Sequence, residues 1–231
     1  SGNNYSVLVG TCDEVTCTTN ISNSVEISNA CVGATTIFRC GNTITESCTM
    51  NRNMPSSGSC FTIGASNIVI NGNGYSITGD NSGNGITITS YNGITLGNLT
   101  ISNFNYGIKT SSSSDDVFDN NIINNIPTDG IRIDGGSNNN VTNNVLIDVS
   151  IGNVNYFAIR IGATPSTNYY VANNNINSSG NCIGMYSRGI SENNNLTCVT
   201  TGILLETANA DYSIANNNIV DGAMYGIYVG I

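Results

Sequence analysis

The stretch "GIRIDGGSNNNVTNNVL", residues 130–146, decides the fold, because it contains both halves of a pattern that recurs along the chain. The first half is a small residue, Ile, any residue, and a residue that is usually apolar. The second half is a run of Asn before an apolar residue. The alternation in "GIRI" sends both Ile side chains to one side of a strand and Arg132 to the other. Short strands separated by turns are therefore expected.

Both halves recur in phase through most of the chain. The first half occurs as "GITI" at Gly85, "GIKT" at Gly107, "GIRI" at Gly130, "AIRI" at Ala158, "CIGM" at Cys182, "GILL" at Gly202 and "GIYV" at Gly226. The steps between the Ile residues are 22, 23, 28, 24, 20 and 24 residues. Two markers recurring together predict a solenoid in which each repeat forms one coil.

The predicted fold is an all-β parallel β-helix of about 7–8 coils, each of 20–31 residues, over residues 61–231. Residues 1–60 are expected to form a Cys-rich, disulfide-bonded region that leads into it. Stacked coils would pair edge to edge at about 4.8 Å and share one core. The L-x-x-L-x-L pattern of leucine-rich repeats is missing. A β-sandwich would need hairpin turns, whereas the repeats here keep a constant phase.

The Asn runs suggest a ladder of side-chain amides at one corner of the stack. Equivalent Asn residues on successive turns would lie in register and hydrogen-bond along the stack. The Asn directly before an apolar residue is the expected member in each coil. The predicted ladder is Asn121, Asn144, Asn175, Asn195 and Asn218.

The composition argues against several partners. The net charge is −9 with only six Lys plus Arg, whereas nucleic-acid binding needs clustered basic side chains. No apolar run approaches the ~20 residues of a membrane span. No cofactor is implied. Charged residues make up 9% and hydrophobic residues 39%, which favours a folded chain over a disordered one.

The cysteines and sequons indicate an exported protein, extracellular or at the cell surface. An even number of cysteines favours disulfides, and the lack of His and of any C-x2-C pair argues against zinc. The eight cysteines are Cys12, Cys17, Cys31, Cys40, Cys48, Cys60, Cys182 and Cys198. The last two are expected to pair, while the first six allow fifteen connectivities. N-glycosylation sequons stand at Asn4, Asn20, Asn98, Asn140, Asn177 and Asn195.

The stretch "SNIVINGNGYSITG", residues 66–79, resembles the first coil of pectate-lyase-like right-handed β-helix proteins. The segment "CGNTITESCTMNRNM", residues 40–54, is similar to their leader. The resemblance covers roughly residues 36–231 and implies a right-handed solenoid of the kind found in exported and surface proteins of bacteria and archaea. It is specific for the fold and poor for activity, because the same solenoid carries lyases, hydrolases, adhesins and inert surface proteins.

An enzyme of this family would need definite chemistry. The resemblance implies an Arg or Lys base with calcium held by carboxylates, or clustered Asp with His, Arg and Lys, and this chain has no His. Lys109, Arg132 and Arg160 take one outward position in three successive repeats, with Asp129 and Asp134 beside them. Such a group could hold a uronic acid or calcium. The alternative interpretation, an Arg132 ion pair on a solvated face, is favoured.

Other acidic residues do not change that interpretation. The segment "SSSSDD", residues 111–116, is expected to be a loop in which Asp115 and Asp116 diverge. No metal site is predicted there. An ice-binding face would need Thr arrays on consecutive coils, and later coils replace Thr.

The last twenty residues, "YSIANNNIVDGAMYGIYVGI", are expected to form a coil with no segment covering it. A truncated sequence, a covering strand at residues 5–9, and docking of a second copy are the alternatives. The docking hypothesis is a head-to-tail structural filament or surface-layer subunit with no enzymatic activity. The residues expected at that contact are Tyr225, Ile227, Val229 and Ile231. The rival functions are a carbohydrate-binding or adhesive module and a polysaccharide lyase or hydrolase.

Overall fold

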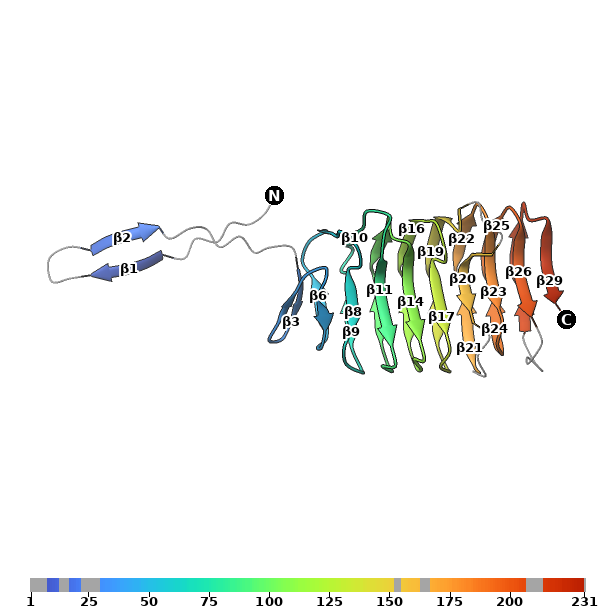
Figure 1. Cartoon of the computed structure of the whole chain (residues 1–231), viewed down its shortest axis with the longest axis horizontal. Helices are drawn as coiled ribbons and strands as arrows, with labels where there is room; N and C mark the ends of the chain where they lie inside the picture. The colour runs from blue at the N-terminus through green and yellow to red at the C-terminus, as the bar shows by residue number, and fades with distance from the viewer. Residues whose placement is uncertain are drawn as a thin grey trace.

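The computed structural model consists of β-strands joined by turns. The described residues are 8–12, 17–21, 30–151, 155–162, 167–206 and 214–230. Within them the strands wind into a parallel solenoid, so the predicted fold is confirmed. Figure 1 shows successive coils side by side from β6 to β29.

Three sheets run along the solenoid in the described part of the chain, and each coil contributes one strand to each sheet in turn. The ten-stranded sheet contains β4 (Ile37–Phe38), β3 (Cys31–Gly33), β6 (Cys48–Met50), β9 (Val69–Asn71), β12 (Thr95–Gly97), β15 (Val117–Asp119), β18 (Asn140–Thr142), β21 (Tyr169–Ala172), β24 (Gly189–Glu192) and β27 (Ile214–Asn216). The eight-stranded sheet contains β7 (Met54–Pro55), β10 (Ser76–Thr78), β13 (Thr100–Ser102), β16 (Ile122–Ile126), β19 (Val145–Val149), β22 (Asn175–Ser178), β25 (Asn195–Cys198) and β28 (Ile219–Asp221). The nine-stranded sheet contains β5 (Thr43–Ile44), β8 (Phe61–Ile63), β11 (Asn84–Thr89), β14 (Tyr106–Ser111), β17 (Ile131–Asp134), β20 (Phe157–Ile161), β23 (Asn181–Met185), β26 (Thr201–Glu206) and β29 (Tyr225–Gly230).

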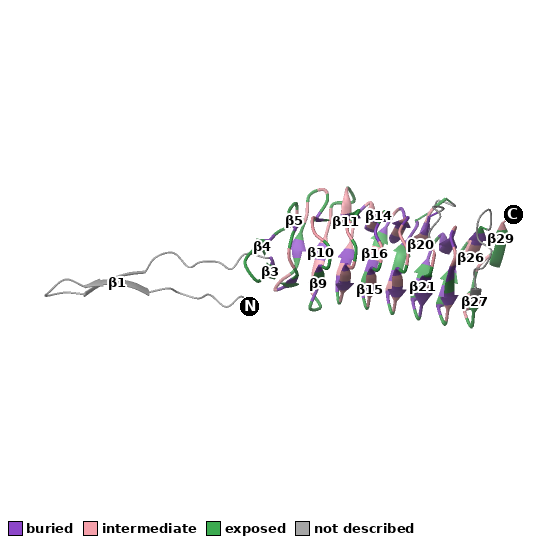
Figure 2. Ribbon diagram, turned by 90° about the horizontal axis from the view of Figure 1, so that it is seen from below, coloured by how far each residue is buried: buried purple, intermediate pink, exposed green. Residues whose placement is uncertain are grey.

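The core is built from apolar residues stacked in register. One column on the nine-stranded sheet consists of Ile86, Ile108, Ile131, Ile159, Ile183 and Ile203, each fully buried. These are the Ile residues of the first marker. Figure 2 shows buried residues alternating with exposed ones along the strands, as expected when one face of each strand lines the core. One coil could not bury these side chains alone, so the stack is the unit of stability.

Steric crowding between neighbouring coils explains why the residue before each Ile is small. A Cβ placed on Gly107 would lie 2.4 Å from the carbonyl oxygen of Gly130 on the next coil and 2.9 Å from Cγ2 of Ile123. Coils at the spacing of hydrogen-bonded strands leave no room there for a larger side chain.

In each Asn pair, the first residue turns the chain and the second residue is buried inside the corner. The first Asn takes a left-handed backbone conformation at the corner between the ten- and eight-stranded sheets, with φ of 54° at Asn120 and 55° at Asn143. Asn tolerates this region better than other residues with a Cβ. The second Asn turns inward and is buried, as at Asn121 and Asn144. The dipeptide therefore turns the chain and satisfies the corner.

The inward Asn residues form a continuous ladder. Each Nδ2 donates to the Oδ1 of the next coil, at 3.1, 3.0, 2.9 and 2.8 Å along the row. The row consists of Asn121, Asn144, Asn174, Asn194 and Asn218. Each Nδ2 also donates to a main-chain carbonyl of the preceding coil, such as Phe118 O at 2.9 Å from Asn144. The ladder thus pairs main-chain groups at a corner where strands do not.

The assignment of Asn175 and Asn195 to this ladder is wrong by one residue. Both side chains are exposed, and Asn195 Nδ2 reaches Asn175 Oδ1 at 3.4 Å outside the core. The outward residue after the ladder is Ile122 in one coil but Asn175 in another. Counting back from the first apolar residue therefore shifted the phase.

Three disulfides lie in the described residues: Cys31–Cys48, Cys40–Cys60 and Cys182–Cys198. The first two connect the segment before β8 and resolve part of the connectivity that spacing leaves open. Cys182–Cys198 joins β23 to β25 inside the solenoid. The side chains of Cys12 and Cys17 lie outside the described residues.

The first strands differ from the regular coils. β1 (Leu8–Cys12) pairs with β2 (Cys17–Ile21) in an antiparallel hairpin. β3 is antiparallel to both β4 and β6, while β5 and β7 already extend two of the solenoid sheets. The Cys-rich segment from residue 30 therefore leads into the coils through an antiparallel turn of chain.

Replacing Asn144 by Ala tests the ladder. The change leaves the carbonyl of Phe118 and the main-chain N–H of Asn121 without partners inside the protein. We expect a loss of about 3 kcal/mol or more in the free energy of unfolding, measured by urea denaturation. Asn175→Ala is the matched control on the exposed side and is expected to change it by less than about 0.5 kcal/mol. Equal losses for the two variants would contradict the register.

Candidate functional site

The outward side chains of the nine-stranded sheet form one row along the solenoid. In order of coils the row is Thr62, Thr87, Lys109, Arg132, Arg160, Gly184, Leu204 and Tyr228. The structure thus places the three basic residues predicted to align on adjacent strands. Thr62 and Thr87 precede the basic residues in the row, and Leu204 and Tyr228 lie at its far end.

The guanidinium of Arg132 is held by two carboxylates. Its Nε lies 2.6 Å from Asp134 Oδ2, and its Nη1 lies 3.4 Å from Asp129 Oδ2. The Arg132 side chain is 24% exposed, and the Tyr106 ring lies below it, 5.8 Å from the guanidinium carbon. Arg132 is therefore an ion-paired residue of the surface.

Asp129 is a positioning residue with no exposed surface. Its Oδ1 accepts a hydrogen bond of 2.7 Å from the main-chain N–H of Phe157. Burial raises the pKa of Asp129, although that hydrogen bond and the charges of Arg160 and Arg132 oppose the change. Its contacts hold the start of β20.

Arg160 lies at the boundary between the charged and the aromatic parts of the row. Its guanidinium carbon is 5.0 Å from the centroid of the Tyr186 ring, and its Nη1 donates to the carbonyl of Asn155 at 3.1 Å. Its Nε is buried and has no hydrogen-bond partner within the part of the chain that the structure describes. Unlike Arg132, it forms no ion pair of 4 Å or less among these residues.

A hollow of about 380 Å³ opens beside Arg160 on this face. Its walls are formed by Asn155, Phe157, Arg160, Asn181, Tyr186, Thr201, Leu204, Tyr225 and Tyr228. The rings of Tyr225 and Tyr228 are 5.6 Å apart, and Phe157 meets Tyr186 edge to face at 6.0 Å. We call this site the aromatic hollow.

Gly184 is buried against the Phe157 ring, which forms one wall of the aromatic hollow. It is the one residue of the outward row, from Thr62 to Tyr228, that lacks a side chain, and a Cβ there would lie 2.9 Å from the Phe157 ring. The ring lies over the gap between Arg160 and Leu204. The basic row was predicted from the sequence, but Tyr186 and Tyr228 beside it were not. A Gly between Arg and Leu at one outward position was the signal that could have revealed the site.

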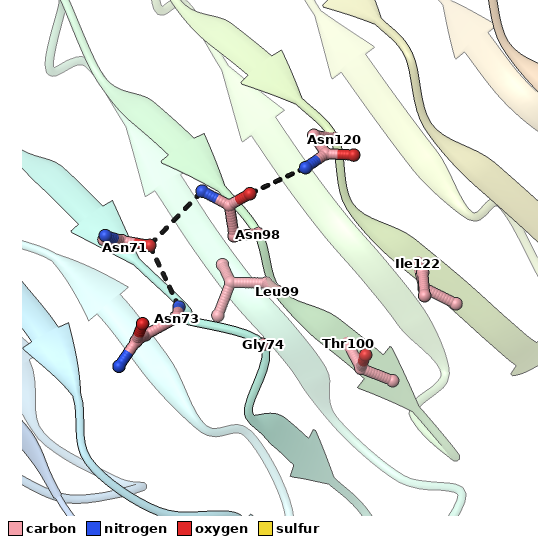
Figure 3. A pocket seen from close by; sticks show the side chains of 8 residues that line it. All are labelled: Asn71, Asn73, Gly74, Asn98, Leu99, Thr100, Asn120 and Ile122. Carbon is pink, nitrogen blue, oxygen red and sulfur yellow. Dashed lines mark hydrogen bonds between the residues drawn. The ribbon is translucent and has the colours of Figure 1, made fainter.

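A second hollow, of about 450 Å³, lies at the corner between the ten- and eight-stranded sheets (Figure 3). It is lined by Asn71, Asn73, Gly74, Asn98, Leu99, Thr100, Asn120 and Ile122. Exposed amides cross it in a short row, with Asn98 Nδ2 donating to Asn71 Oδ1 and Asn120 Nδ2 donating to Asn98 Oδ1. We call this site the amide hollow. Its lining contains no charged side chain.

Asp115 and Asp116 diverge, as the loop interpretation requires. Asp115 is exposed and accepts a hydrogen bond from Asn138, whereas Asp116 is fully buried. Asp116 Oδ1 accepts the N–H of Ile94 at 2.9 Å, and Ser113 Oγ lies 2.6 Å from Asp116 Oδ2. No group of three or more potential metal ligands among His, Cys, Asp and Glu occurs within the described ranges.

Burial and hydrogen bonding shift the pKa of Asp116 in opposite directions. Ser113 Oγ is the donor to Asp116 Oδ2 and also hydrogen-bonds the carbonyl of Tyr91. Burial has the larger effect and raises the pKa of Asp116 to about 6, against the opposing effect of its hydrogen bonds from Ser113 and Ile94.

Asp116→Asn is expected to stabilise the protein at pH 7 and to leave it unchanged at pH 3.5. A carboxyl with a raised folded-state pKa stabilises the fold below its unfolded pKa, and this contribution is lost as the pH rises through the folded value of about 6. Relative to an ordinary value near 3.9, the loss amounts to about 3 kcal/mol as an upper bound. Urea denaturation of variant and parent across this range measures the difference.

Asp115→Asn is the control for the Asp116 experiment, because Asp115 is adjacent but exposed. Its effect on the free energy of unfolding at pH 7 is expected to be smaller than that of Asp116→Asn, because the Asp115 charge is the last of the causes acting on Asp116. A difference between Asp116→Asn and the parent that does not grow between pH 4 and pH 7 would contradict a buried carboxyl with a raised pKa.

Among the described residues, no helix has the length and hydrophobicity of a membrane span.

The sequons differ in their structural positions: Asn98 lies in a turn, whereas Asn140, Asn177 and Asn195 lie within β18, β22 and β25. The side chain of Asn20 and the whole of Asn4 lie outside the described residues, as does Ile231.

Comparison with known proteins places the fold in a known group. The family model described as a right-handed beta helix region matches residues 63–195. No curated protein matches the chain. A solved structure of an alginate lyase from Paenibacillus sp. str. FPU-7 is similar with a TM-score of 0.52 and 14% identity, covering 83% of this chain and 93% of that one.

A catalytic domain of a GH87 alpha-1,3-glucanase in complex with nigerose aligns with a TM-score of 0.43 and 15% identity. That alignment covers 77% of this chain and 39% of the glucanase chain. At 14% identity, the similarity to the lyase shows the fold alone.

Proposed function

We propose, on the premise that the chain belongs to the right-handed β-helix family, that it is a secreted protein that binds a polysaccharide in the aromatic hollow. The observation that carries the proposal is the aromatic hollow itself, where the exposed rings of Tyr225 and Tyr228 lie with Tyr186 and Arg160 around one cavity. Ligand sites commonly combine aromatic walls with a few polar groups that orient the ligand.

The tyrosines suit the apolar face of a sugar ring. Tyr225 and Tyr228 are about half exposed, at 50% and 49%, although their rings contact each other. Tyr186 contacts both the Phe157 ring and the Arg160 guanidinium. A rigid aromatic wall binds a ring at a small cost in conformational entropy.

The solenoid also matches the repeat of a polysaccharide. Successive coils advance by about 4.8 Å, which is close to the length of one extended pyranose residue. A glycan chain lying along the row would meet a new outward side chain at each sugar. The row from Arg160 through Gly184 and Leu204 to Tyr228 would then contact consecutive sugars.

The charges favour an uncharged or sparsely charged polysaccharide. The chain carries a net charge of −9, which repels polyanions. The positive charge of Arg132 is compensated by Asp129 and Asp134. Arg160 remains as a donor to sugar oxygens, since guanidinium groups donate readily to neutral acceptors.

The proposal is binding without cleavage. Arg132 is occupied by two carboxylates, and Asp129 has no exposed surface, so neither is presented to a ligand for proton transfer. Burial raises the pKa of Tyr186, so its phenol stays protonated at neutral pH. The lyase interpretation would need carboxylates to hold calcium beside the Arg160 side chain, and none lines the aromatic hollow within the described residues.

Titration calorimetry with cello-, xylo- and chito-oligosaccharides, and with oligogalacturonates as the acidic comparison, tests the proposal. We expect at least one neutral series to bind more tightly than the acidic one. Tyr225→Ala should weaken that binding about tenfold, a loss of ~1.4 kcal/mol. Gly184→Thr should abolish it, because the new side chain would displace the Phe157 ring.

Tyr106→Ala is the matched control, since Tyr106 lies on the same sheet beside Lys109 and outside the aromatic hollow. It should leave binding of short oligosaccharides unchanged. A folded parent chain that binds no glycan of a broad array, or that releases cleaved products from one, would overturn the proposal.

Head-to-tail association is the second candidate, favoured by the exposure of core positions on β29. Ile227 and Val229 pair with Ile203 and Leu205, yet they are 53% and 55% exposed, whereas their partners are 0% and 8% exposed. The occupant we propose is a second copy, whose β5 and β7 are the last strands of their sheets at the opposite edge. The antiparallel β3–β4 hairpin occupies the third sheet there, so only two sheets would continue.

Sedimentation velocity over a range of concentrations tests this association. Val229→Lys should shift the distribution toward monomer, because a charge would be buried at the contact. Val199→Lys is the control, a valine with 61% exposure that lies off β29. A parent chain that stays monomeric at high concentration would contradict this second candidate.

A further inference from the structure

We propose that Asn98 is the N-glycosylation acceptor that this fold presents, and that the attached sugar lies in the amide hollow. The sequon is Asn98–Leu99–Thr100, and all three of its residues line that hollow (Figure 3). The inference does not rest on the polysaccharide proposal, because the amide hollow lies between the ten- and eight-stranded sheets and shares no lining residue with the aromatic hollow.

Asn98 differs in its backbone setting from the other sequon asparagines whose side chains the structure describes. Asn98 lies between β12 and β13 with a φ of 56°, and its side chain is exposed. The acceptors Asn140, Asn177 and Asn195 lie inside strands that pair on both edges. A sequon is expected to be used in a surface loop, where the acceptor can reach the transferase.

The hydrogen bonds of Asn98 are compatible with a substituted amide. Nδ2 carries two protons, and one of them is donated to Asn71 Oδ1 at 3.3 Å. Oδ1 accepts from Asn120 Nδ2 at 2.6 Å. An N-linked sugar replaces one proton and leaves one, so both contacts can remain. Asn144 in the buried ladder donates to both Phe118 O and Asn174 Oδ1, and so has no proton to give up.

The amide hollow offers a suitable surface for the first sugar. Its volume of about 450 Å³ lies within the ~300–1,000 Å³ of pockets that hold small ligands. Ile122 is 43% exposed at its edge and can cover the apolar face of a pyranose ring. Asn73 and Thr100 supply amide and hydroxyl groups beside it. The uncharged lining suits an N-acetylhexosamine, which is neutral.

The transfer needs a co-substrate and an enzyme of definite classes. The donor is an oligosaccharide linked through pyrophosphate to a lipid, and the enzyme is a membrane-bound oligosaccharyl transferase. The bond from the anomeric carbon to the pyrophosphate oxygen breaks with its electron pair, and the lipid pyrophosphate leaves. A bond forms between that carbon and Asn98 Nδ2, and one Nδ2 proton passes to a base of the transferase.

Secretion of the full chain from a eukaryotic host, followed by peptide mass spectrometry, tests the acceptor. We expect the peptide containing Asn98 to carry glycan at higher occupancy than the peptides of Asn140, Asn177 and Asn195. Asn98→Gln should remove that glycan, and Thr100→Ser should retain part of it. Asn177→Gln is the matched control and should leave the Asn98 glycan unchanged. An unmodified Asn98 in a secreted, folded chain would overturn the proposal.

The position of the sugar is tested by a separate measurement on the glycosylated parent chain, so this test does not depend on whether a variant folds. Nuclear Overhauser effects on the glycosylated parent should connect protons of the first sugar with the methyl groups of Ile122. Trimming the glycan to that first sugar should preserve these contacts. A glycan on Asn98 whose protons show no contact with Ile122 or Asn73 would overturn the placement in the amide hollow.

Discussion

The structure depends on satisfying main-chain polar groups at the corners of the coil. Along the sheets, each strand pairs with the same strand of the next coil, but at a corner the backbone turns away from that direction. The inward Asn residues meet this need. Asn121 Oδ1 accepts the N–H of Leu99, and Asn144 Oδ1 accepts the N–H of Asn121, while each Nδ2 returns to a carbonyl of the preceding coil. An orphaned buried amide or carbonyl costs about 1–3 kcal/mol, so each coil depends on its neighbours.

In-register stacking has consequences on both faces of the coil. Inside, it aligns Ile86 with Ile108 and requires a small residue such as Gly107 where coils approach most closely. Outside, it converts a change at one position per repeat into a column on the surface. The basic row, Gly184, Leu204 and Tyr228 are successive members of one such column. The proposed polysaccharide site follows from that geometry.

Much of the fold could be predicted because periodicity reports stacking directly. The spacing of the Ile residues predicted the coils, and the outward alignment of Lys109, Arg132 and Arg160 followed from it. The ladder was misassigned in two coils, because Asn175 takes the outward place that Ile122 takes elsewhere. A polar residue at that outward position therefore shifted the count by one.

The aromatic hollow and the buried Asp116 could not be derived in the same way. Tyr186 follows β23 in a turn, and Phe157 reaches it from the adjacent coil, so their meeting depends on turn geometry that a period does not specify. Asp116 takes an inward position beside Asn139, whose Oδ1 accepts its main-chain N–H. The sequence "SSSSDD" alone does not show which of its two carboxylates is buried, because that depends on the backbone conformation of the corner.

The shared corner hydrogen bonds are tested most directly by amide hydrogen exchange measured by NMR. The main-chain N–H groups of Asn121, Asn144 and Asn174 donate only to the side-chain oxygen of the next coil in this structure. If the ladder holds the coils together, these three amides exchange as slowly as those of Ile131 and Ile159 in the adjacent strands, through global unfolding. Exchange at the fast rates of surface turns, while the strand amides stay protected, would contradict the account.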